Sequence, residues 1–239
     1  MELNVVGGAR AQDTRGALAS VARVMPGVWA IVVAGGGGRR FGRAKQFEDL
    51  AGRRVLDWSL AVARATCEGV VAVLPADRLE PGASAGGATR SASVRAGLAA
   101  VPAAARVVVV HDAARPLAGP ALFERVVAAV DAGADGAVPG IALADTVKRV
   151  DGHRVTATVD RDDLVAVQTP QAFRADVLRA AHGARPEATD DAALVEALGG
   201  TVVVVEGDRR NFKITSPDDL FVARALVGDD DGPEMAGGG

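Results

Sequence analysis

A glycine-rich loop that carries several cations is the part of this sequence best suited to chemistry. Four glycines at 35–38 follow the apolar run at 29–33, and Arg39, Arg40 and Lys45 come soon after. Glycines expose backbone N–H donors and let a ligand approach closely, while guanidinium and ammonium groups add full positive charge. The loop therefore favours a polyphosphate ligand. The alternative interpretation is a flexible glycine turn with surface arginines.

The loop matches neither of two common phosphate-binding motifs. The pattern G-x-G-x-x-G fails in every register, because Phe41 or Arg40 stands where the third glycine is required. In the P-loop motif a glycine precedes the lysine and a serine or threonine follows it, whereas Lys45 lies between Ala44 and Gln46. The loop thus indicates a nucleotide site of another type.

Charged residues also follow a second apolar run, at 106–110. Asp112 comes at the end of this predicted strand, where a carboxylate could help to hold Mg²⁺ or a ribose hydroxyl, and Arg115 could bind a second anion. The alternative is that Asp112 caps the turn and Arg115 lies on the surface. Lys213 precedes a helix start at 216–219 whose serine, proline and acidic residues are explained by capping alone. Lys213 is therefore available for a ligand.

Composition excludes several classes of protein. The 239 residues include 27 basic and 30 acidic ones, and the net charge of -3 argues against a nucleic-acid surface built on bulk charge. No apolar run is long enough to span a bilayer. The single cysteine, Cys67, rules out an intramolecular disulfide framework and fits a reducing compartment, so we expect a cytoplasmic protein. The three histidines show no metal-ligand spacing.

Strand and helix patterns alternate along most of the chain. This order predicts an α/β fold with a mostly parallel sheet, right-handed crossovers and helices on both faces. Ligands of such sheets bind beyond the carboxyl ends of the strands, which would bring the glycine loop and Asp112 together. The predicted strands lie at 29–33, 69–75, 106–110, 136–139 and 201–205, and the predicted helices at 55–63, 89–98, 122–130, 176–181 and from 216.

Two segments rich in β-branched residues, 145–150 and 153–159, interrupt the alternation. An Asp-Gly pair at 151–152 joins them, which indicates a hairpin. Because both strands carry charge, we expect an arm at about 143–168 that projects from the sheet and whose exposed edge invites a second subunit. We expect the whole chain to consist of a weakly ordered extension at 1–27, one domain at 28–228 that includes the arm, and a disordered acidic and glycine-rich tail at 229–239.

Eight motifs in order resemble those of the 2-C-methyl-D-erythritol 4-phosphate cytidylyltransferase family. The resemblance covers residues 28–227, and HDAARP is its most specific part. The motifs are AGGGGRR at 34–40 with KQ at 45–46, GG at 86–87 with Arg90 and Ser93, HDAARP at 111–116, DTVK at 145–148, VDR at 159–161, TPQ at 169–171, TDD at 189–191 and NFKIT at 211–215.

The resemblance implies a reaction: the CMP group of CTP is transferred to 2-C-methyl-D-erythritol 4-phosphate and pyrophosphate is released, in non-mevalonate isoprenoid synthesis. It also implies a Rossmann-like, GT-A-like nucleotidyltransferase fold, Mg²⁺ as cofactor with no protein ligand assigned, and a homodimer joined through the arm. Neither nucleic acid nor membrane is an expected partner.

The resemblance further implies a role for individual residues. Arg40 and Lys45 would be the catalytic cations on the CTP phosphates. The nucleotide would be bound by Ala34, Gly35, Gly36, Gly87, Ser93, Asp112 and Ala113. Methylerythritol phosphate would be bound by Asp112, Arg115, Thr146, Arg161, Arg174, Thr189 and Lys213, with Thr146 and Arg161 supplied by the partner's arm.

The chemistry of the reaction is consistent with these residue types. Two anionic groups must meet, and two unit charges about 4 Å apart in a partly dry site repel by roughly 4 kcal/mol. Several cations offset this repulsion, and the ionised acceptor phosphate needs no general base. Two alternatives remain: a cytidylyltransferase for another polyol phosphate such as ribitol 5-phosphate, and a catalytically silent nucleotide-binding module, although a silent module has no reason to keep Arg40, Lys45, Asp112 and Lys213 together.

Overall fold

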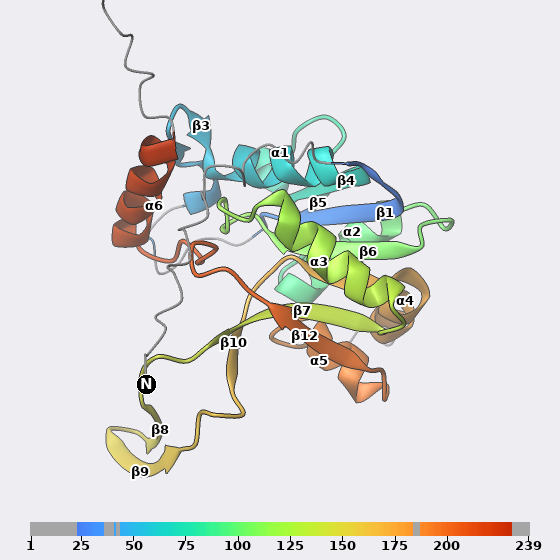
Figure 1. Cartoon of the computed structure of the whole chain (residues 1–239). Coiled ribbons are helices and arrows are strands. Elements are labelled where there is room, and N and C mark those ends of the chain that lie inside the picture. The colour runs from blue at the N-terminus through green and yellow to red at the C-terminus, as the bar shows by residue number, and fades with distance from the viewer. Residues whose placement is uncertain (1–22, 36–40, 42–43, 184–186, 231–239) are drawn as a thin grey trace, which may run out of the picture.

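The computed structural model describes residues 23–35, 41, 44–183 and 187–230, and a central sheet with helices on both faces dominates it (Figure 1). Its strands follow the order β10-β7-β11-β6-β1-β4-β5, with β12 also paired to β7. The strands are β1 (Met25–Val33), β4 (Cys67–Leu74), β5 (Ser84–Ala85), β6 (Val107–Asp112), β7 (Gly136–Ala142), β10 (Val165–Val167), β11 (Gln171–Arg174) and β12 (Val202–Glu206).

Most strands of this sheet run in one direction. β1 pairs in parallel with β4 and β6, β4 with β5, and β12 with β7. The exception is β11, which is inserted antiparallel between β6 and β7, together with β10, which is antiparallel to β7. The predicted mostly parallel sheet is confirmed, and the reversed strands follow the hairpin, where no crossover helix turns the chain around.

The alternation of side chains along β1 builds two cores. Val28, Ala30 and Val32 face one layer, while Ile31 faces the other, as a repeat of two residues requires. The first layer holds α1 (Val55–Thr66) and α3 (Pro120–Asp131). The second layer holds α2 (Arg90–Ala100), α4 (Ala175–Gly183) and α5 (Ala192–Ala197). The predicted coverage of both faces is confirmed.

A third cluster lies beside the main sheet and packs α6 (Pro217–Asp230) against the segment that follows the glycine loop. This segment contains the short helix η2 (Lys45–Phe47) and the two-stranded unit of β2 (Asp49–Leu50) and β3 (Arg53–Arg54). Another short helix, η3 (Ala76–Arg78), follows β4. Because β1 begins at Met25 and α6 ends at Asp230, regular structure begins slightly before the predicted domain and ends slightly after it.

The predicted arm is present as a separate hairpin. β8 (Val147–Asp151) and β9 (Arg154–Val159) pair only with each other among the described residues, and they project from the sheet (Figure 1). The turn is one residue later than predicted, because Asp151 already pairs with Arg154 and Gly152 takes a φ of +55°. None of the described helices is both long enough and apolar enough to cross a membrane.

Candidate active site

A cavity of about 680 Å³ lies at the carboxyl ends of β1 and β6, which is the edge predicted from the parallel strands. Its size is typical of small-molecule sites. Five parts of the chain line it: the end of β1 at Ala34 and Gly35, the segment of η2 at Lys45 and Gln46, the turn before α2 at Gly87, the end of β6 at Asp112 and Ala113, and the segment before α6 that contains Lys213.

Two glycines that line this cavity pack closely against α2. A Cβ atom on Gly35 would lie 3.0 Å from Ser93 Oγ, and one on Gly87 would lie 2.4 Å from Ala92 Cβ. The Ser93 hydroxyl accepts a hydrogen bond from Gly87 N at 3.2 Å and donates one to Thr89 O at 2.9 Å. Ser93 therefore holds the glycine turn against the first turn of α2 and leaves backbone exposed to a ligand.

The cations of the cavity come from three elements far apart in the sequence. Lys45 begins η2, Arg90 begins α2, and Lys213 precedes α6. Gln46 is buried, and its Nε2 donates to the carbonyl oxygen of Ala34 at 2.6 Å. This bond fixes η2 to the end of β1 and thereby sets where Lys45 enters the cavity.

Asp112 is the acidic centre of the cavity. Lys213 Nζ lies 2.6 Å from Oδ2, and Arg90 Nε lies 3.3 Å from Oδ1. Burial of Asp112 opposes ionisation, but the charges of Arg90 and Lys213 outweigh it and hold the pKa of this carboxyl well below its usual range. The carboxylate is thus ionised and its two oxygens point to two different cations. In the described part of the chain, no group of three or more His, Cys, Asp or Glu is placed to hold a metal ion.

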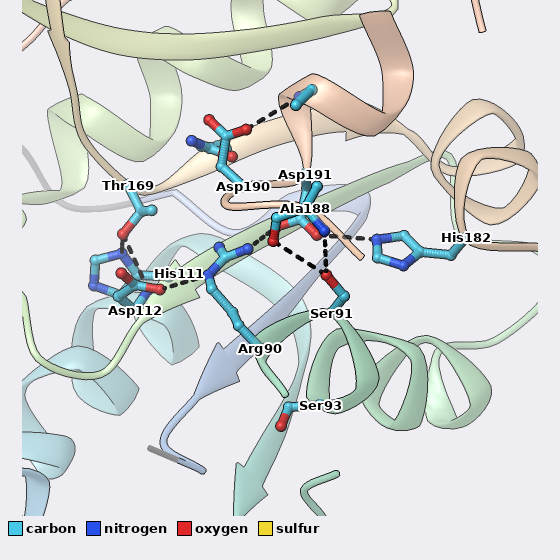
Figure 2. A network of polar contacts seen from close by, with 12 residues as sticks. Arg90, Ser91, Ser93, His111, Asp112, Thr169, His182, Ala188, Asp190 and Asp191 are labelled. Carbon is cyan, nitrogen blue, oxygen red and sulfur yellow. Dashed lines mark hydrogen bonds and ion pairs between the residues drawn. The ribbon is translucent and has the colours of Figure 1, made fainter. Parts of the chain in front are cut away.

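A buried histidine fixes the end of β6 (Figure 2). His111 Nε2 lies 3.2 Å from Arg115 O, a carbonyl that can only accept, so this nitrogen carries the hydrogen. His111 Nδ1 then accepts from the hydroxyl of Thr169 at 3.1 Å, and the same hydroxyl oxygen accepts from Asp112 N at 3.0 Å. Burial lowers the pKa of His111 to about 4, so the ring is neutral and serves to orient the backbone at Asp112.

The comparisons with known proteins agree with this geometry. The sequence model described as 2-C-methyl-D-erythritol 4-phosphate cytidylyltransferase matches residues 28–229. The chain belongs to this family. It is 42% identical over 221 residues to the enzyme of that name from Rubrobacter xylanophilus, covering 85% of this chain and 96% of the relative. The enzyme of that name from Frankia casuarinae is 47% identical over 217 residues, covering 84% of this chain and 82% of the relative.

A solved structure shows the same fold. The crystal structure of 2-C-methyl-D-erythritol 4-phosphate cytidylyltransferase from Thermus thermophilus superposes with a TM-score of 0.73 at 38% identity, covering 83% of this chain and 98% of that chain. The resemblance to the cytidylyltransferase family and the α/β fold that it implied are therefore confirmed.

Within this family fold, the cavity brings together most of the predicted nucleotide residues. Ala34, Gly35, Gly87, Ser93, Asp112 and Ala113 line it, as do Lys45 and Lys213. Arg40 and Gly36 lie outside the described residues, so their predicted roles stay predictions. Arg90 and Gln46 belong to the motifs quoted above but had no assigned role. The signal for Arg90 was its position at a helix start, three residues after a glycine pair.

Five of the seven predicted acceptor residues, Arg174 among them, do not line this cavity. Arg115 turns away, because its guanidinium donates to the backbone oxygens of Asn211 at 2.8 Å and Val167 at 3.5 Å. Thr189 is on the segment before α5. Thr146 and Arg161 are at the base of the arm, where Arg161 Nη1 donates to Ala144 O. Their assignment to a partner's site requires a second subunit and remains a prediction.

The structure places Arg174 at the wrong end of the sheet for the predicted role. In the antiparallel register of β11 and β6, Arg174 lies opposite Val107, five residues and about 16 Å along the strand from Asp112. Its guanidinium lies 3.4 Å from Asp135 and 2.8 Å from Asp176. The expectation that Arg174 binds substrate in this cavity is therefore wrong, and the reversed direction of β11 is the reason.

Proposed function

We propose that this chain transfers the CMP group of CTP to 2-C-methyl-D-erythritol 4-phosphate and releases pyrophosphate. The observation that carries the proposal is the cavity in which bare glycine backbone, one ionised carboxylate and the cations Lys45, Arg90 and Lys213 converge. Membership of the cytidylyltransferase family supports both the nucleotide and the acceptor.

The reaction joins an oxygen of the acceptor phosphate to the α-phosphorus of CTP, while the bond from that phosphorus to the bridging oxygen of the β-phosphate breaks and pyrophosphate leaves with the electron pair. The acceptor oxygen is already ionised, so no side chain has to remove a proton. Repulsion between the anions adds to the barrier by about 4 kcal/mol for two unit charges about 4 Å apart at a partly exposed site. Cations held in place before the substrates arrive lower this barrier.

We assign the two ends of the cavity to the two substrates. Gly35 and Gly87 offer backbone to the nucleotide, and Ser93 keeps the Gly87 turn in place. Lys45 would contact the triphosphate, with Arg40 and Gly36 acting beside it. Asp112 and Lys213 would hold the acceptor, the carboxylate through a hydroxyl and the ammonium through the phosphate.

The remaining predicted residues belong to a proposed homodimer. Thr146 and Arg161 would reach a partner's cavity through the projecting arm, and Arg115 and Thr189 would complete the acceptor site. The exposed edges of β8 and β9 support this pairing. A cytoplasmic location is part of the proposal, because Cys67 is a buried thiol and the chain contains no other cysteine.

The described part of the cavity offers Mg²⁺ one protein carboxylate, so the ion would bind together with the substrate phosphates. Asp112 is the acidic residue that lines the cavity within the described chain, and Mg²⁺ is commonly held by one or two carboxylates together with substrate phosphates. Asp112 and the triphosphate would hold the ion, whose charge would stabilise the phosphates. Asp112 would keep its contacts with Arg90 and Lys213 when it holds the ion, because each carboxylate oxygen has a second lone pair.

The test is pyrophosphate release by the purified chain with CTP, Mg²⁺ and methylerythritol phosphate. Parallel reactions replace CTP with UTP, and methylerythritol phosphate with ribitol 5-phosphate. The proposal predicts turnover that depends on both CTP and methylerythritol phosphate. A preference for ribitol 5-phosphate would assign the chain to another polyol phosphate, and CTP binding without turnover would indicate a silent binding module.

A further inference from the structure

We infer that Asp191 and His182 form a buried positioning pair that holds Arg90, and through it Asp112, in the geometry that the acceptor requires. The inference rests on the proposed cytidylyl transfer and adds two residues that do not touch the cavity. Neither residue lines it, yet both connect to it through an unbroken series of polar contacts (Figure 2).

The contacts alternate in charge. Arg90 Nη1 lies 2.7 Å from Asp191 Oδ2, and Arg90 Nε lies 3.3 Å from Asp112 Oδ1. The guanidinium is thus held between a carboxylate of the cavity and a second carboxylate that has no exposure to solvent. Since the guanidinium is planar and donates in fixed directions, two acceptors on different edges define its orientation. Arg90 therefore cannot turn without breaking one of them.

The side chain of Asp191 contacts Arg90 and does not cap the helix that it precedes. Asp191 stands at the N-cap position of α5, but its carboxylate accepts no capping hydrogen bond. The neighbouring Asp190 accepts from Ala193 N at 3.1 Å instead. An aspartate at an N-cap normally stabilises the helix start by accepting such a bond. Capping thus explains Asp190 and leaves Asp191 for Arg90.

His182 completes the pair from α4. Its Nε2 lies 2.9 Å from Asp191 Oδ1, and because an ionised carboxylate can only accept, this nitrogen carries the hydrogen. His182 Nδ1 is buried and has no hydrogen-bond partner among the described residues. The polar function of the ring is therefore the bond to Asp191. It occupies the carboxylate oxygen that Arg90 does not use.

A second contact brings the two segments together. Ser91 follows Arg90 in α2, and its hydroxyl lies 3.3 Å from Ala188 N and 3.4 Å from Ala188 O, so the chain before α5 is attached to α2 beside Arg90 (Figure 2). Burying an ion pair contributes little to stability compared with apolar packing. A structural role alone would be met by apolar residues here, whereas orientation of a cavity arginine requires the carboxylate.

The test compares Asp191→Asn with the wild-type chain in the pyrophosphate assay. Loss of the carboxylate charge should raise the KM for methylerythritol phosphate about tenfold, because Asp112 loses its fixed partner, and should leave the KM for CTP within about twofold. Asp218→Asn is the matched control, since it makes the same change on the exposed first turn of α6 and should leave both KM values unchanged. Melting temperature is measured for every variant.

A double-mutant cycle separates positioning from folding. If Asp191 acts through Arg90, Asp191→Asn should have no further effect on KM in the Arg90→Gln background. An equal loss in both backgrounds, or an unchanged KM in folded Asp191→Asn, would overturn the inference. If Asp191→Asn fails to fold, two His182 variants provide the test. His182→Leu should raise the KM for methylerythritol phosphate, whereas His182→Gln, which retains an N–H donor, should keep this KM close to the wild-type value. Equal KM values in the two variants would overturn the inference. Absence of turnover in the wild-type chain would instead count against the proposed function.

Discussion

Replacement of Gly87 by alanine should lower the rate of cytidylyl transfer strongly without unfolding the protein. The added Cβ would lie 2.4 Å from Ala92 Cβ, 3.1 Å from Ala92 C and 3.3 Å from Ala92 Cα. Ala92 is itself fixed, because its N–H donates to the Thr89 hydroxyl at 3.0 Å in the N-cap of α2. The glycine turn therefore has to move, and the hydrogen bond from Gly87 N to Ser93 Oγ has to lengthen.

The size of the effect follows from the size of the overlap. Carbon atoms in contact lie about 3.5–4.0 Å apart, so the turn must shift by about 1.1 Å to relieve the contact. A displacement of about 1 Å at a reacting centre can lower the rate about 100-fold, which corresponds to about 2.7 kcal/mol in the activation free energy. Because the turn is at the surface, we expect the unfolding free energy to fall by only about 1 kcal/mol.

The assay is pyrophosphate release with CTP and methylerythritol phosphate, together with thermal unfolding. Gly228→Ala in α6 is the control, because a Cβ there would contact nothing within 4 Å and should leave turnover unchanged. Ala92→Gly in the Gly87→Ala background should restore part of the activity, since it removes the nearest atom of the overlap. Full activity in Gly87→Ala, or no recovery in the double variant, would refute the proposed close approach of the backbone.

Three further predictions follow from titratable groups of the structure. Lys213→Met removes the cation 2.6 Å from Asp112. Because the lysine side chain is 37% exposed, the unfolding free energy measured in urea titrations should fall by only about 1 kcal/mol. The KM for methylerythritol phosphate should rise, and an unchanged KM would contradict the assignment of Lys213 to the acceptor. Burial of Asp219 opposes ionisation, but hydrogen bonds from Thr215 and Ser216 outweigh it and lower the pKa. This stabilisation is present above the unfolded pKa of about 4 and is lost as the pH falls through the lower folded value, so Asp219→Asn should flatten the acid side of the stability profile, and an unchanged slope there would count against it. Burial raises the pKa of the Cys67 thiol to about 11, so native protein should resist iodoacetamide at about pH 8 and react only when unfolded, as mass spectrometry would show; rapid alkylation of the native chain would exclude this burial.

The sequence alone determined the layers of the fold and the edge of the sheet where the site lies. Apolar runs with a period of two or 3.6 residues set strands and helices through local sterics, and parallel strands then place their carboxyl ends on one edge. The start of the glycine loop after β1 and the cap before α6 could also be predicted from the sequence, because both depend on interactions between residues close together in the chain. The predicted cap is present, because Asp219 N donates to Ser216 Oγ at 3.3 Å, and the structure adds a return bond from Ser216 N to Asp219 Oδ2 at 2.8 Å.

Only the tertiary structure decided which distant side chains share the cavity. Lys213 and Asp112 are 101 residues apart, as are Asp191 and Arg90, and no local pattern fixes such a distance. The direction of β11 could not be predicted from the sequence either. Its antiparallel register with β6 places Arg174 at the amino end of β6, away from Asp112. Contacts of this kind depend on the register and direction of paired strands and on the packing of helices over them. They are therefore set by the whole chain, while the elements themselves are set by their own residues.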